Sequence, residues 1–97
     1  MKFVIVGFDG PHGSEKRPLH RPAHLERLQN LYDQGKLVLA GPFTDKAGSL
    51  MIIEADSLEE ATAFAQSDPY TIHGVFEQIT IHPFHQVLPA LPETPSS

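Results

Sequence analysis

A histidine and an aspartate, His24 and Asp68, each lie at the start of a predicted helical segment, and their spacing permits them to meet if the fold brings these two ends together. A carboxylate bonded to one imidazole nitrogen fixes the tautomer and raises the basicity of the other nitrogen, giving an acid or base useful near neutral pH. Such a pair suits proton abstraction next to a carbonyl group, followed by elimination or double-bond migration. The alternative is that Asp68 only caps a short helix begun by Pro69, and that His24 is a half-buried structural residue.

Two further side chains are candidates for holding a substrate beside this pair. Arg21 precedes His24 by three residues, so both share one helical face if both are helical, and its guanidinium is suited to clamp a substrate carboxylate. A surface or interface ion pair explains Arg21 equally well. Tyr70 is placed either to donate a hydrogen bond to a developing enolate or to pack with its hydroxyl at the rim of a pocket.

Three small residues complete the predicted binding site. Gly41 and Pro42 end a predicted strand, and glycine allows the backbone to approach a ligand closely. Ser49, at the start of the next strand, is a weaker candidate for the lining of the pocket.

The six histidines raise the alternative of a metal site. His20 and His24 have a spacing that can bring two imidazoles to one metal, although Pro22 between them is expected to leave His20 outside the helix. His82 and His85 flank Pro83 at the end of the last predicted strand and are expected to face solvent. Because no acidic residue joins either pair at a familiar metal-site spacing, we predict no metal and no cofactor.

Composition excludes several classes of protein. The absence of cysteine removes disulfides, thiolate chemistry and cysteine-based zinc sites. A formal net charge of −5 with only seven basic residues argues against nucleic-acid binding, which needs a clustered positive face. The apolar N-terminal run is too short to span a membrane and leads into Asp9 and Gly10, so it indicates a strand. We therefore expect a cytoplasmic protein.

The elements that must position these residues follow from hydrophobic periodicity and from capping signals. Strands are predicted at residues 2–8, 37–40, 49–55 and 75–84, with a hairpin connection at 44–48. A first helix is predicted to start between Leu19 and Pro22 and to end at Gly35, and a second runs from the capping box Ser57–Glu60 to about Gln66.

This order, β-α-β-β-α-β, predicts a ferredoxin-like α+β fold in which both helices cover one face of a four-stranded antiparallel sheet. Consecutive apolar residues in the strands leave the other face apolar as well, which predicts a homodimer on which higher oligomers can be built. We expect one domain over residues 1–88 and a proline-rich tail over residues 89–97.

Several segments, in this order and spacing over residues 2–88, closely resemble the YCII-related family: Arg21-Pro22-Ala23-His24-Leu25, Gly35-Lys36-Leu37, Ala40-Gly41-Pro42, Ser57-Leu58-Glu59-Glu60-Ala61, Asp68-Pro69-Tyr70 and Gly74-Val75-Phe76. The resemblance implies a dimeric α/β-barrel assembly and a pocket in which His24 faces Asp68. It also implies dehydrochlorinase-type lyase activity on chlorinated aromatic breakdown products.

Two functional hypotheses follow. In the first, the chain is a cofactor-free lyase or isomerase in which His24, oriented by Asp68, moves a proton on a small carboxylated or phenolic substrate held by Arg21. In the second, the same pocket holds a small anion without turnover, as a binding or regulatory module.

Overall fold

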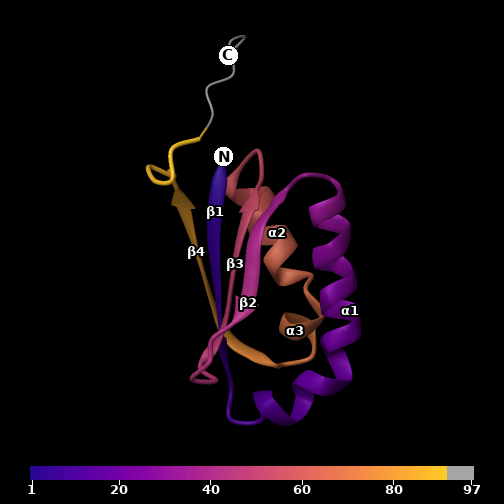
Figure 1. Ribbon diagram of the computed structural model, residues 1–97. Helices are drawn as coiled ribbons and strands as arrows, with labels where there is room; N and C mark the ends of the chain where they lie inside the picture. Colours follow the sequence, from indigo (N-terminus) through magenta and orange to yellow (C-terminus); the bar gives the residue numbers. More distant parts are fainter. Residues whose placement is uncertain (92–97) are drawn as a thin grey trace.

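The computed structural model describes residues 1–91 and contains a four-stranded antiparallel sheet with helices on one face (Figure 1). The strand order is β2-β3-β1-β4, and all three pairings are antiparallel. The predicted ferredoxin-like α+β arrangement is therefore confirmed, and the short helix expected to begin at Pro69 is present before the last strand. The elements are β1 (Lys2–Asp9), α1 (Gly13–Asp33), β2 (Leu37–Pro42), β3 (Gly48–Glu54), α2 (Leu58–Gln66), α3 (Pro69–Ile72) and β4 (Phe76–Phe84).

The predicted start of the first helix was wrong, because α1 begins at Gly13 and contains both Pro18 and Pro22. Each proline removes one backbone donor but leaves the helix otherwise continuous. Tertiary contacts favour the longer helix: Arg17, in the added turns, binds the carboxylate of Asp9 through two hydrogen bonds of 2.7 Å. At Gly13 an added Cβ would lie 2.8 Å from the Asp9 Cβ, so the first turn packs directly against the end of β1.

The predicted end of α1 is confirmed in detail. Gly35 has a φ of +74°, the left-handed conformation that glycine adopts without steric cost. Its N–H donates to the Tyr32 carbonyl at 2.9 Å, and the Lys36 N–H donates to the Leu31 carbonyl at 3.0 Å. These two bonds form a Schellman motif, which satisfies the last carbonyls of the helix.

Each of the two helices α2 and α3 begins with a side-chain cap. The Ser57 hydroxyl accepts from the Glu60 N–H at 3.1 Å, as the capping box predicts. The Glu60 carboxylate, however, accepts from the backbone N–H of Asp56 and not from that of Ser57. Asp68 then caps α3, accepting from the Tyr70 N–H at 2.8 Å, with Pro69 in the first helical position. This restart turns the chain and brings Asp68 and Tyr70 towards α1.

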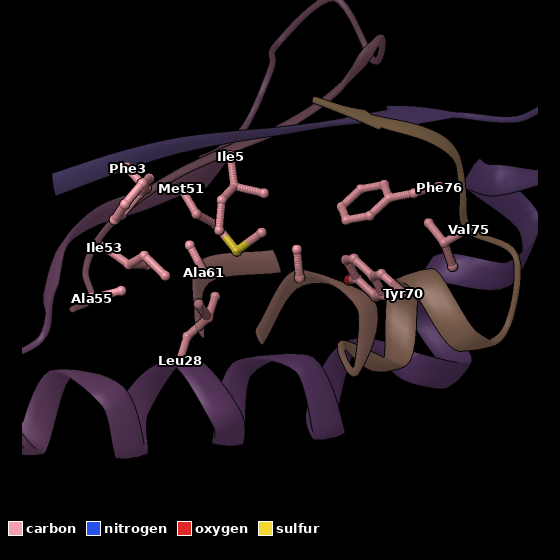
Figure 2. Packing of buried hydrophobic residues seen from close by; sticks show 11 residues of the cluster. Phe3, Ile5, Leu28, Met51, Ile53, Ala55, Ala61, Tyr70, Val75 and Phe76 are labelled. Carbon is pink, nitrogen blue, oxygen red and sulfur yellow. The ribbon is translucent and has the colours of Figure 1, made fainter. Parts of the chain in front are cut away.

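The hydrophobic core fills the space between the sheet and the helices (Figure 2). Alternate residues of β1 and β3 point into it and pair across the strands, Phe3 with Ile53 and Ile5 with Met51. Figure 2 shows these side chains facing Leu28 of α1, with Tyr70 and Phe76 at one end of the cluster. Burial of this apolar surface is the main source of stability.

The opposite face of the sheet carries the other half of the alternation: Val4 pairs with Ile52 and Val6 with Leu50, and all four are only half-buried. The homodimer stays a prediction that this apolar face motivates. Residues 92–97 of the predicted proline-rich tail lie outside the described residues. Among residues 1–91, no helix has the length and apolar character needed to cross a membrane.

Candidate active site

His24 and Asp68 form a buried hydrogen-bonded pair between α1 and the start of α3. Nδ1 of His24 lies 2.8 Å from one carboxylate oxygen of Asp68 and 2.9 Å from the other. The histidine is 5% exposed and the aspartate 0%, so solvent does not compete for the bond. Because an ionised carboxylate only accepts hydrogen bonds, Nδ1 carries the proton, and in the neutral ring Nε2 is left as the acceptor.

Asp68 is held by more than the histidine. Its carboxylate also accepts from the Tyr70 N–H, and Nη1 of Arg27 lies 3.8 Å away. The Arg27 guanidinium is fixed in turn by a 2.8 Å bond to the Ser67 hydroxyl and by a position 4.4 Å above the Phe64 ring. A buried charge is tolerated only when it is paired in this way. Arg27 was not singled out from the sequence.

Tyr70 covers one face of the His24 ring. The two rings lie parallel, with centroids 3.9 Å apart and planes 9° apart, and Phe76 meets the Tyr70 ring edge-on at 5.5 Å. Burial raises the pKa of the Tyr70 hydroxyl, an effect opposed in part by the nearby Arg17 and Arg21 guanidinium groups. The hydroxyl is therefore protonated near neutral pH and available as a hydrogen-bond donor.

An ion pair between Arg17 and Asp9 borders the same site and was missed from the sequence. Besides binding Asp9, Nη2 of Arg17 donates to the Ser49 hydroxyl at 3.0 Å, and the guanidinium lies 5.0 Å from the centre of the Tyr70 ring. The hydrogen bond to Asp9 is the main reason that the pKa of Arg17 is raised. The clustering of three basic residues, Lys16, Arg17 and Arg21, within six positions of the sequence is a signal that could have found it.

These side chains surround a cavity of about 220 Å³, which we call the inner cavity. Its polar wall contains Arg17, Arg21, His24, Ser49 and Tyr70, and its apolar wall includes Leu28 and Met51. Gly41 and Pro42 of the edge strand β2 also line it. The structure thus brings together every predicted site residue: six line the cavity, and Asp68 lies behind His24.

The remaining histidines do not join this site. His20 is helical, against expectation, and its ring stacks on that of His73 with centroids 4.0 Å apart. His24 already has Nδ1 engaged by Asp68. Within residues 1–91, no three His, Asp or Glu side chains gather in a way that would hold a metal ion. That the chain uses no metal or cofactor stays a prediction.

Known proteins share much of this sequence. The protein named YciI from Escherichia coli O6:H1 (strain CFT073) is 42% identical over 97 residues, which covers 90% of this chain and 99% of the relative. An uncharacterised protein from Haemophilus influenzae is 34% identical over the same coverage.

A solved structure extends the likeness to three dimensions. It is the 5-chloro-2-hydroxyhydroquinone dehydrochlorinase TftG from Burkholderia phenoliruptrix AC1100, in complex with 2,5-dihydroxybenzoquinone. It superposes with a TM-score of 0.78 at 30% sequence identity, covering 88% of this chain and 94% of the other. The model of the YCII-related domain matches residues 1–85. The chain therefore belongs to the YCII-related domain family.

Proposed function

We propose that this chain is a cofactor-free lyase or isomerase that acts on a small phenolic or carboxylated substrate, with His24 as the base. The observation that carries the proposal is the buried His24–Asp68 pair in the wall of a cavity of single-ring size. The dehydrochlorinase activity named for TftG supports elimination of a halide as the reaction type.

Each polar group of the inner cavity is assigned a role in this proposal. Asp68 holds the Nδ1–H of His24, so Nε2 accepts the substrate proton and Asp68 stabilises the imidazolium that forms. Ser49 accepts from Arg17, so its own O–H is free to donate to a substrate oxygen. Tyr70, kept protonated by burial, donates to a developing enolate, and Arg21 binds an anionic substituent.

The elimination balances without an external oxidant. For a chlorinated hydroquinone, the proton of the hydroxyl next to the chlorinated carbon moves to that carbon. The carbon becomes tetrahedral, and the oxygen that lost the proton forms a carbonyl group. His24 then takes the proton of the opposite hydroxyl, whose oxygen forms the second carbonyl as the ring double bond shifts. The electron pair of the C–Cl bond leaves as chloride. The ring is oxidised to a quinone while the carbon–chlorine bond is reduced.

The experiment that tests this proposal measures chloride release from 5-chloro-2-hydroxyhydroquinone by ion chromatography, with related halogenated phenols as a panel. We expect turnover by the wild type and a loss of roughly a hundredfold or more in kcat for His24→Gln, the range of general acid–base catalysis. His85→Gln, an exposed histidine beyond β4, is the matched control and should keep full turnover. Unchanged chloride release by His24→Gln would contradict the proposal.

A second candidate is a module that holds a small anion without turning it over. It is favoured by the guanidinium of Arg21 in the cavity wall, which makes no ion pair with any of residues 1–91. A comparison of turnover with ligand binding distinguishes the two candidate functions. If the panel gives no turnover while 2,5-dihydroxybenzoquinone still binds, and if Arg21→Gln weakens that binding, the second candidate replaces the first.

A further inference from the structure

A second cavity, of about 420 Å³, adjoins the inner one, and we call it the outer cavity. The two share four wall residues, Arg17, Arg21, Pro42 and Tyr70, so they are neighbouring compartments. Beyond this shared wall, the outer cavity is lined by the first turns of α1 and by the β2–β3 hairpin, including Ser14, Pro18, Phe43, Lys46 and Gly48.

The charges around the outer cavity do not cancel. Its lining contains three cations, Arg17, Arg21 and Lys46, and one acid, Asp9. Asp9 is fully engaged by the two hydrogen bonds from Arg17. Arg21 and Lys46 form no ion pair with any of the described residues. In a chain whose formal net charge is −5, this leaves two uncompensated cations facing one space.

The hairpin that carries Lys46 has a defined shape. Lys46 has a φ of 67°, a left-handed conformation that is uncommon for residues other than glycine. It is held there because its N–H donates to the Phe43 carbonyl at 3.1 Å and the Asp45 carboxylate accepts from the Ala47 N–H at 2.9 Å. The turn thereby fixes the point from which the lysine side chain lines the outer cavity.

The sizes of the two cavities indicate a substrate with two parts. At about 220 Å³ the inner cavity is smaller than the roughly 300 Å³ at which pockets for drug-sized ligands begin, so it suits a single ring. Such a ring, placed against His24, would leave the whole outer cavity unused. A side arm that passes between Tyr70, Pro42 and Arg21 would enter it.

We propose that the preferred ligand is a phenolic ring carrying an anionic arm, with the ring in the inner cavity and a carboxylate on the arm bound by Arg21 and Lys46 in the outer cavity. Lys46 is then a specificity-determining residue. The inference rests on the proposed function only for the chemistry of the ring, because binding of the arm does not require turnover.

The test compares two probes by isothermal titration calorimetry: a hydroquinone with an acetate arm (homogentisate) and the same ring with the uncharged acetamide arm. We expect the acetate probe to bind the wild type roughly tenfold more tightly. Lys46→Gln should reduce this advantage about fivefold, the upper range for an exposed ion pair, and leave the amide probe unaffected. Raising the salt concentration should weaken only the acetate probe.

Two control variants make the result specific. Lys36→Gln removes an exposed lysine that lies outside both cavities and should leave both affinities unchanged. Lys46→Asn should repeat the effect of Lys46→Gln, because asparagine tolerates the left-handed backbone and so preserves the turn.

The inference is overturned if the acetate arm brings no gain over the amide, including the case in which neither probe binds, or if Lys46→Gln weakens both probes alike. A carboxylate-dependent gain without any chloride release from the halogenated panel would support the inference while rejecting the proposed lyase function. The two failures are therefore distinguishable.

Discussion

The ring of Tyr70 lies parallel to that of His24, 3.9 Å away, while Asp68, two residues earlier in the chain, binds the edge of the same imidazole. The start of α3 therefore holds the His24 ring in two ways: Asp68 bonds its edge, and Tyr70 stacks on its face. The tautomer is set by the carboxylate, and the orientation of the ring plane by the tyrosine.

The first prediction separates the chemical and structural roles of Asp68. Asp68→Asn keeps a side-chain oxygen to accept from the Tyr70 N–H but loses the charge that stabilises the His24 imidazolium. We expect kcat to fall roughly a hundredfold with little change in KM. Asp68→Ala also removes the cap and leaves Arg27 unpaired, so it should cost about 3 to 5 kcal/mol of unfolding free energy. Steady-state kinetics and urea denaturation measure the two effects; equal stability of the two variants would contradict the assignment.

The second prediction concerns the Tyr70 hydroxyl at alkaline pH. Burial raises the pKa of the folded state above the ordinary 10.0 of the unfolded chain. Between these two pKa values the folded state binds more protons than the unfolded state. The unfolding free energy should consequently fall as the pH rises above 10.0. Arg17→Gln removes a cation that favours the phenolate and should raise this pKa further. Ultraviolet titration, taken as the difference from Tyr70→Phe, measures it; a lower pKa in Arg17→Gln would argue against the arrangement.

The third prediction compares two glycines near the site. An added Cβ on Gly48 would collide with the backbone carbonyl of Gly7 on the paired strand, whereas at Gly41 there is nothing within 4 Å. Gly48→Ala should therefore cost at least about 3 kcal/mol, the upper end for overpacking, because backbone cannot move aside as a side chain can. Gly41→Ala should change stability by less than about 0.5 kcal/mol. Urea denaturation of both variants decides the comparison, and similar midpoints would contradict the close approach of β1 and β3.

The fourth prediction tests the homodimer. Ile52 and its neighbours Val4 and Leu50 form the apolar face of the sheet that no helix covers. Ile52→Glu places a charge there and should convert a dimer into a monomer in sedimentation experiments. Leu58→Glu, at an exposed position of α2, is the control and should leave the mass unchanged. A wild-type protein that sediments as a monomer at micromolar concentration would reject the dimer.

Local signals in the sequence predicted most of the fold. The consecutive apolar residues in β1 and β3, the glycine at the end of α1, and the caps at Ser57 and Asp68 are each local signals, so they could be recognised without the tertiary structure. The start of α1 could not. Pro18 and Pro22 favour a late start locally, whereas the early turns contact residues outside the helix: Arg17 binds Asp9 on β1 and Ser49 on β3.

The site was predicted less directly than the fold. The spacing of His24 and Asp68 only permits their contact, and the expectation that they meet came from the family resemblance. Arg27 was missed because its contribution depends on where α2 ends: its guanidinium is held by the Phe64 ring and the Ser67 hydroxyl, and periodicity does not reveal such contacts.

Asp68 both caps α3 and bonds His24, and this limits which residues can replace it as the sequence diverges. A side chain without an acceptor at position 68 loses both the cap of α3 and the bond to His24, so folding itself selects against it. An asparagine keeps the helix start and gives up only the charge. Under the proposed function, this single substitution would remove proton transfer and keep the fold.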